Sequence, residues 1–174
     1  MKWSKSSSLL LIAVCGTACS PPLDWREFVA EGTDLTVSFP CRPDHHARSL
    51  SLAGAKVQMD MLVCSAAAAT FAVSTVLVSD PAKMAGTLKE LRLAAVANVQ
   101  GGEPELSPID IKGMTPNDQA TRLTVKGRLP DGTDVVEQSL LFTRGLRAYQ
   151  AVVIGAKPDQ RAADVFFAAL RFPQ

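Results

Sequence analysis

The spacing of apolar residues changes three times along this chain, and the order of the changes restricts what it can fold into. From Leu35 to Val78, and again from Ala120 to Ile154, apolar residues alternate with polar ones or form β-branched runs, which predicts β-strands. Between these regions, and again after Pro158, they recur every three or four positions, which predicts amphipathic helices. This order predicts an α+β fold in which two helices cover a mostly antiparallel β-sheet.

Turn and capping residues divide these regions into elements. Asp80 is a preferred N-cap residue, Pro81 a preferred first helical residue, and Gly101-Gly102 ends the helix. Pro130-Asp131-Gly132 predicts a hairpin turn. The predicted strands cover residues 35–39, 48–52, 56–65, 70–78, 120–129, 135–143 and 147–154, with a proline-interrupted edge strand at 106–111. The residues predicted to be buried are Met84, Leu88, Leu91, Ala95 and Val99 in the first helix and Ala162, Val165, Phe166, Ala169 and Leu170 in the second, which Pro158 opens.

The first residues have the layout of a secretory signal peptide. Lys2 and Lys5 give a positive start without an acid, residues 9–14 form a short apolar run, and small residues follow. The apolar run is far below the roughly 20 residues that span a bilayer. We therefore expect residues 1–18 to be a signal peptide and the mature chain to be exported.

The small residues Gly16-Thr17-Ala18 stand directly before Cys19 and resemble the lipobox of bacterial lipoproteins. In that family a diacylglyceryl group is attached to the cysteine sulfur before cleavage. Gly16 occupies the position where the family prefers leucine, so ordinary cleavage after Ala18 stays an alternative. Cys15 is a poorer candidate because bulky Val14 precedes it. We expect Cys19 to be acylated.

The lipobox resemblance also implies a location. Ser20, rather than aspartate, follows the cysteine, which resembles the sorting pattern of outer-membrane lipoproteins. We expect the protein to be anchored in the bacterial cell envelope, in the outer membrane, and to face the periplasm. Residues 19–24 would be an acylated tether, and residues 25–174 a single α+β domain held close to the lipid.

Two further cysteines, Cys41 and Cys64, form an even pair, which predicts a disulfide in an oxidising compartment. A turn at Ala53-Gly54-Ala55 would pair the flanking strands so that Cys64 falls opposite Pro43 or Asp44. Cys41 then lies only two or three residues further along, within reach of a bridge. Two buried free thiols are the alternative, and a metal site would need more ligands than this pair.

No pattern in the chain predicts catalysis or a cofactor. His45-His46 would point to opposite sides of an extended segment, which favours a solvated loop over a metal site. Asp131, Asp134 and Glu137 are close in sequence, but Asp131 belongs to the predicted turn and Asp134 can pair with Arg128 across the hairpin. There is no Gly-x-Ser-x-Gly elbow, glycine-rich phosphate loop, CxxC or HExxH. We expect no enzyme activity, no cofactor and no catalytic or metal site.

Charge gives one further candidate surface. The chain has 18 Lys+Arg and 17 Asp+Glu, a balance that argues against nucleic-acid binding. Arg122, Lys126 and Arg128 line one side of a predicted strand and could meet an acidic partner, although a solvated sheet face is the favoured interpretation. Met59 and Met61 could suggest a soft-metal site, but their inward spacing favours core packing.

Three segments carry a family resemblance. They are Trp25-Arg26-Glu27-Phe28 with Glu31-Gly32, Val37-Ser38-Phe39-Pro40 and Pro43, then Arg144-Gly145-Leu146-Arg147-Ala148-Tyr149-Gln150, and finally Phe166-Phe167 with Leu170-Arg171-Phe172. Together they resemble small exported bacterial proteins with the PsbP-like α/β/α sandwich, a fold named for an extrinsic photosystem subunit. Its members are mostly adaptors and assembly or binding factors without a shared catalytic set. The resemblance therefore implies a fold and a binding role, and no functional residue.

These observations together predict a non-catalytic envelope lipoprotein that serves as a protein-binding, assembly or adaptor module. Its expected partners are the membrane, through the lipid anchor, and an envelope protein, with no nucleic acid. The alternative is a periplasmic module that binds a small ligand or a metal, for which the sequence offers only His45-His46 and the methionines.

Overall fold

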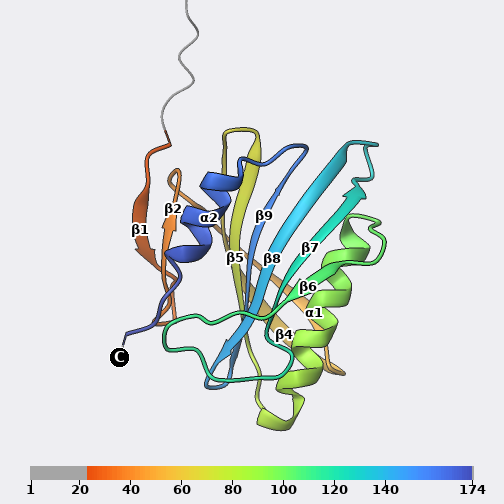
Figure 1. Cartoon of the computed structure of the whole chain (residues 1–174). Coiled ribbons are helices and arrows are strands. Elements are labelled where there is room, and N and C mark those ends of the chain that lie inside the picture. Colours follow the sequence, from red (N-terminus) through yellow and green to blue (C-terminus); the bar gives the residue numbers. More distant parts are fainter. Residues whose placement is uncertain (1–22, 174) are drawn as a thin grey trace, which may run out of the picture.

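The computed structural model describes residues 23–173, in which seven antiparallel strands form a main sheet and two more form a small sheet beside it (Figure 1). Across the main sheet the order is β3 (Asp44–Leu52), β4 (Ala55–Ala66), β5 (Ala69–Leu77), β9 (Arg147–Gly155), β8 (Asp134–Arg144), β7 (Thr121–Arg128) and β6 (Glu105–Ser107). The small sheet pairs β1 (Arg26–Val29) with β2 (Thr36–Phe39). With two α-helices packed on this sheet, the expected α+β fold is confirmed.

Different elements cover the two faces of the main sheet. α2 (Gln160–Ala168) and the small sheet lie on one side, and α1 (Met84–Asn98) lies on the other (Figure 1). We call these sides the α2 face and the α1 face. Each face has its own cluster of buried apolar side chains. The described part of the chain contains no helix long and apolar enough to cross a bilayer.

Aromatic rings hold the α2 face together. Phe166 of α2 lies 5.4 Å from Phe39 of β2 and 5.4 Å from Phe71 of β5, measured between ring centroids. Phe142 of β8 stacks on Tyr149 of β9 at 5.2 Å. All five rings are essentially buried, and burial of one such side chain contributes on the order of 2 kcal/mol. The rings thus fasten α2 and β2 to the centre of the sheet.

α1 covers the other face as its sequence predicted. The Asp80 carboxylate accepts a 2.9 Å hydrogen bond from the Ala82 N–H at the start of the short 3₁₀ helix η1 (Pro81–Lys83), which leads into α1. All five residues of the predicted stripe are buried: Met84, Leu88, Leu91, Ala95 and Val99. At the other end of α1, the Val99 carbonyl accepts a 2.5 Å hydrogen bond from the Arg128 N–H of β7. The helix is therefore fixed to the sheet at its last turn.

The close approach of α1 to β7 depends on a glycine. A Cβ added to Gly127 would collide with the carbonyl oxygen and the side chain of Val99. Gly101-Gly102 does not itself reverse the chain, because Gln100 already takes the left-handed conformation, with φ of 48°. Gly101 instead lets the chain pass close to β7, since a Cβ on Gly101 would collide with Val125.

The predicted second helix is placed slightly wrongly. The helix begins at Gln160 rather than at Pro158, and Asp159 is its N-cap: the Asp159 carboxylate accepts hydrogen bonds from the N–H groups of Arg161 and Ala162, at 2.7 and 3.3 Å. Val165 is 47% exposed and Ala169 only half-buried, contrary to the prediction. Burial of both Phe166 and Phe167 determines which side of the helix faces the sheet. The buried residues are therefore Ala162, Ala163, Phe166, Phe167 and Leu170.

Four other features differ from the prediction. β3 begins at Asp44 rather than at residue 48, and β1 was not predicted. In the predicted edge strand only Glu105–Ser107 pairs, while Ile109 and Ile111 turn inward to the α2-face core. Between the predicted strands 56–65 and 70–78 lies a two-residue hairpin turn, in which Ala67 and Ala68 have φ of 49° and 59°.

Candidate functional site

The predicted disulfide is present between Cys41 and Cys64, whose Cα atoms are 6.0 Å apart. The register pairs Leu52 with Ala55 and Asp44 with Val63, which puts Cys64 opposite Pro43, one of the two positions expected from the sequence. Cys64 is buried beside Phe71 on the α2 face. The bridge joins the chain leaving β2 to the main sheet, so its role is structural. Cys19, the expected lipidation site, lies outside the described residues, as does the expected signal peptide.

The histidine pair lies in a strand, which corrects the prediction of a loop. His45 and His46 belong to β3, opposite Leu62 and Met61 respectively, and are exposed on opposite faces. The imidazole Nε2 of His45 is 3.8 Å from the Asp60 carboxylate of β4. Within residues 23–173 no three histidine, cysteine or acidic side chains come together in a way that could hold a metal ion.

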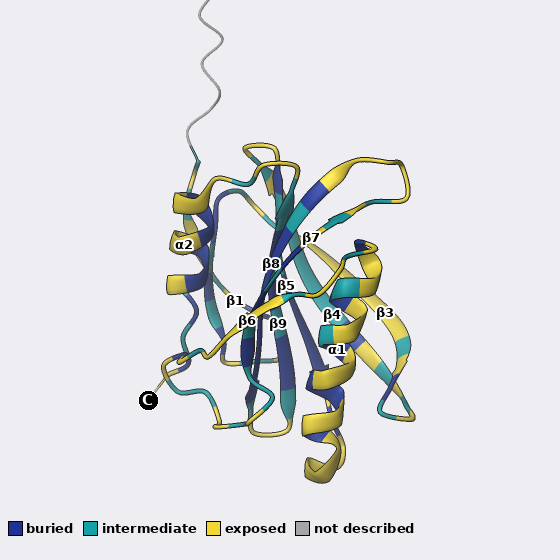
Figure 2. Cartoon of the chain, turned by 45° about the vertical axis from the view of Figure 1, so that its right-hand side comes forward, coloured by how far each residue is buried: buried dark blue, intermediate teal, exposed yellow. Residues whose placement is uncertain are grey.

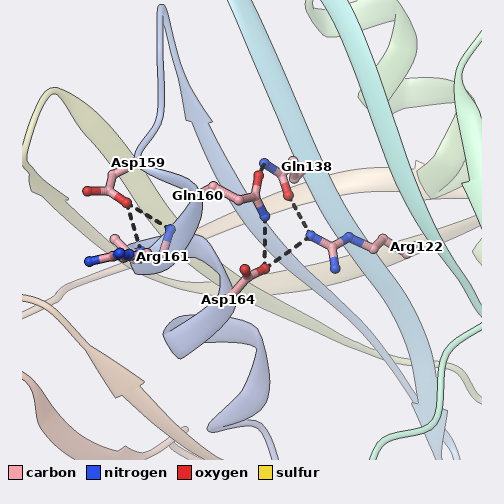
Figure 3. Close-up of polar contacts among 7 residues, drawn as sticks. Arg122, Gln138, Asp159, Gln160, Arg161 and Asp164 are labelled. Atoms are coloured by element: carbon pink, nitrogen blue, oxygen red, sulfur yellow. Dashed lines mark hydrogen bonds and ion pairs between the residues drawn. The ribbon is translucent and has the colours of Figure 1, made fainter.

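The predicted cationic row on β7 is divided by the fold. Arg122 donates a 2.6 Å hydrogen bond to the Gln138 side chain of β8 and lies 3.7 Å from Asp164 of α2 (Figure 3). Its guanidinium also sits 5.3 Å from the centre of the Phe167 ring. Gln160 completes the ring of contacts by bonding to both Gln138 and Asp164, at 3.0 and 2.8 Å. Arg122 therefore anchors α2 to the sheet, and the interpretation as a solvated residue is wrong for this position.

The other two cations of the row do face solvent. Arg128 lies opposite Asp134, with Nε and Oδ1 2.7 Å apart, as the sequence predicted. This hydrogen bond raises the pKa of Arg128. Lys126 is exposed. Because each arginine already has an acidic neighbour, the row is not a continuous cationic surface.

The three carboxylates that are close in sequence do not converge. Asp131 and Asp134 are exposed at the β7–β8 turn, and the Thr133 N–H bonded to Asp131 lowers the pKa of that carboxyl. Glu137 is buried in the strand, 4% exposed, and burial raises the pKa of its carboxyl. The methionines also follow the sequence interpretation: Met59 is buried and Met61 half-buried in the α1-face core.

The feature that the sequence did not reveal is the outer edge of the main sheet. β3 is nine residues long, and within the described residues no strand pairs with its outer side. Figure 2 shows it as the outermost, largely exposed strand of the β3–β4 hairpin. By contrast, the opposite edge strand β6 has only three residues. β3 is therefore the longest open row of backbone donors and acceptors in this sheet.

The hairpin register defines which backbone groups of β3 are free. Leu52 and Ala55 close a two-residue turn in which Ala53 and Gly54 have φ of 48° and 70°. In such a turn the closing residues exchange both hydrogen bonds, so every second residue counting back from Leu52 bonds to β4. The N–H and C=O groups of the residues between them point outward. These residues are His45, Ala47, Ser49 and Ser51.

The side chains along this edge leave room for a neighbouring strand. All residues from Asp44 to Ser49 are exposed, and no proline or lysine occurs in β3 to discourage pairing. Asp44 and Arg48 place opposite charges four residues apart on the same face of the strand. A strand docking here would be selected by its own charges at the matching spacing.

Comparisons with known proteins do not assign the chain to a family. No protein-family model matches it, and no curated protein matches its sequence. Among solved structures, the chain is similar to a crystal structure from Bacteroides thetaiotaomicron VPI-5482, with 12% sequence identity and a TM-score of 0.48. The alignment covers 85% of this chain and 48% of that chain, so the present chain spans about half the length of that protein.

The edge was missed in the sequence for a specific reason. A strand with both faces exposed lacks apolar alternation, so Asp44–Ala47 gave no strand signal. The turn signal at Ala53-Gly54 and the length of the partner strand were available. Since β4 runs for twelve residues, a hairpin partner of similar length could have been inferred.

Proposed function

We propose that this protein is a non-catalytic binding module of the bacterial cell envelope, which holds an extended segment of another envelope protein along β3. The single observation that carries the proposal is the exposed nine-residue edge with outward backbone groups at four alternate residues. Backbone pairing would supply affinity, and the charges of Asp44 and Arg48 would select the segment. The segment that fits has a basic residue opposite Asp44 and an acidic residue opposite Arg48.

The anchoring of the module is part of the same proposal. An acylated Cys19 would hold the domain on the periplasmic side of the outer membrane through the short tether 19–24. The order of layers, with α2 and the small sheet on one face and α1 on the other, supports the PsbP-like α/β/α sandwich as the closer description of the fold. The adaptor role of that family is consistent with an edge that binds peptides.

Site-specific cross-linking in intact envelopes tests the proposal. A photoreactive residue at Ser49, whose backbone faces outward, should trap one envelope protein, whereas the same residue at exposed Lys89 on α1 should not. Ala47→Pro should abolish the Ser49 cross-link because it removes an outward N–H, a change that edge strands tolerate. Ala47→Val keeps that N–H and should preserve the cross-link.

Several outcomes would contradict the proposal. Cross-linking that Ala47→Pro leaves unchanged would show that backbone pairing is not involved. The same protein trapped at Lys89 would indicate nonspecific contact. A cross-link only to a second copy of this chain would replace the envelope partner with a homodimer. An unchanged far-UV circular dichroism spectrum of Ala47→Pro serves as the folding control.

A further inference from the structure

A second feature of the described chain is a pocket of about 380 Å³ at the base of the β3–β4 hairpin. It lies between the first residues of β4, from Ala55, and the segment that connects β5 to η1. Three cations, Lys56, Lys83 and Arg147, line it. The volume is within the range of small-molecule sites.

The pocket exists because β4 and β5 do not pair along their whole length. β4 pairs with β3 from Ala55 onward, but with β5 only from Met59 onward. By the alternation set at the hairpin turn, the backbone N–H and C=O groups of Lys56 and Gln58 point toward the missing partner. These backbone groups therefore face the pocket, where a ligand could form hydrogen bonds with them in place of β5.

The charges in the pocket are not balanced. Within residues 23–173, none of Lys56, Lys83 and Arg147 has a carboxylate oxygen within 4 Å. Asp60 is the acidic residue among those that line the pocket, and its carboxylate is the one beside His45, at 3.8 Å. The excess of positive charge favours an anion, and lysine and arginine are both strong donors to carboxylate and phosphate oxygens.

Part of the remaining wall of the pocket is apolar, beside the polar residues Gln58, Ser79 and Thr87. Leu52 and Val78 are buried, Val57 is half-buried, and Leu77 is 56% exposed although its side chain is large and aliphatic. An apolar wall beside three cations suits a ligand with one anionic group and a short hydrocarbon body. A bare inorganic anion would leave this wall unused.

We propose that this pocket binds a small amphipathic anion. Its carboxylate or phosphate group is attracted by the charges of Lys56, Lys83 and Arg147, and its apolar body lies against the exposed side chain of Leu77. This site is separate from the outer edge of β3, so the proposed ligand binding and the proposed partner binding can be tested independently.

Nuclear magnetic resonance of the full chain carrying Cys19→Ser tests the site, with hexanoate and hexyl phosphate as probes. Both probes should shift the amide signals of Gln58 and Ser79, and hexanol, which lacks the charge, should shift them far less. Lys56→Gln combined with Lys83→Gln should weaken binding at least about tenfold, because charge-assisted hydrogen bonds are lost. The matched control, Lys89→Gln combined with Lys126→Gln, should bind as the parent does, as should Ala47→Pro.

The proposal is overturned by any of three results. These are no shift with either probe at millimolar concentration, shifts that map to residues away from the pocket, and binding of hexanol as tight as that of the anions. Equal weakening by the control pair would mean that overall charge, and not this pocket, attracts the probes. Melting temperatures of all variants establish that each one is folded.

Discussion

Ser139 and Glu137 form a buried pair on β8, where the serine hydroxyl donates a 2.6 Å hydrogen bond to Oε1 of the glutamate. Ser139 is fully buried and Glu137 nearly so, on the face that α1 covers in part. Burial raises the pKa of the glutamate, and the hydrogen bond from Ser139 opposes this only in part. The carboxyl is thus held in surroundings that favour its neutral form.

This pair makes stability depend on pH. Because the folded-state pKa of Glu137 lies above its ordinary 4.5, the folded chain binds more protons than the unfolded chain between the two values. The free energy of unfolding therefore falls as pH rises through that window. Glu137→Gln, which can still accept the Ser139 bond, should stabilise the protein by on the order of 1 kcal/mol at pH 8 and much less at pH 4.

Urea unfolding of the Glu137→Gln variant at several pH values measures this effect. Glu105→Gln, at an exposed carboxyl, is the control and should show no comparable pH dependence. A stability difference for Glu137→Gln that is the same at every pH would contradict the assignment.

The Cys41–Cys64 bridge closes a loop across a separation of 23 residues. Its loss should lower the free energy of unfolding by about 3 kcal/mol, since the unfolded chain gains conformational freedom. Thermal unfolding with and without reductant measures the difference. The Cys41→Ala/Cys64→Ala variant should already have the lower stability and should not respond to reductant, and a response there would point to another cause.

The turn after β4 places two alanines in the left-handed region, at φ of 49° and 59°. Asparagine and glycine adopt this conformation more readily than alanine does. Ala67→Asn combined with Ala68→Gly should therefore stabilise the protein by about 1–2 kcal/mol. Ala66→Gly, at a position without positive φ, should destabilise it instead. Denaturant midpoints of the two variants should move in opposite directions, and a shift of both in one direction would refute the explanation.

Gly127 and Gly102 provide a matched pair for the contact between α1 and β7. Gly127→Ala should destabilise the protein by about 1–3 kcal/mol or more, because its Cβ collides with the backbone of Val99. A Cβ at Gly102 meets nothing within 4 Å, so Gly102→Ala should change little. Comparable melting temperatures for the two variants would mean that the helix end can move away without cost.

Cys19 decides whether the proposed anchor exists. Cys19→Ala should leave an uncleaved or soluble species, whereas Cys15→Ala should keep the protein in the membrane fraction through a salt wash. Labelling with a radioactive fatty acid, followed by fractionation, measures both. If the unaltered protein is soluble in the periplasm and takes up no label, it is not a lipoprotein.

Much of the fold could be predicted because local signals agreed with the tertiary structure. Asp80 caps the 3₁₀ helix η1 that leads into α1, Asp131 stabilises the predicted turn, and the turn at Ala53-Gly54 sets the register that brings Cys64 near Cys41. Each of these signals acts over a few residues, and the core strands carry apolar residues on the faces that the sheet buries.

The candidate sites could not be predicted, because they depend on contacts between distant elements. The sequence predicts that Arg122 is a solvated strand residue, because it does not show that α2 places Asp164 and Phe167 beside it. The free edge of β3 requires knowledge of the strand order, and the pocket beside Lys56 requires knowledge that β5 stops pairing with β4 at Met59. Sequence periodicity reports which residues are buried, not which strand has no neighbour.

The position of β9 has a consequence for how the protein is made. This strand is the last of the sheet in the chain, yet it lies between β5 and β8, and so it joins the segment β3–β4–β5 to the segment β8–β7–β6. Until Arg147–Gly155 has been synthesised, the two half-sheets have no shared strand, and each exposes an additional open edge. Closing them is a late, non-local step, which favours slow folding. A polypeptide that stays unfolded until its C-terminal part arrives would suit passage through a membrane channel as an extended thread, with assembly completed on the far side.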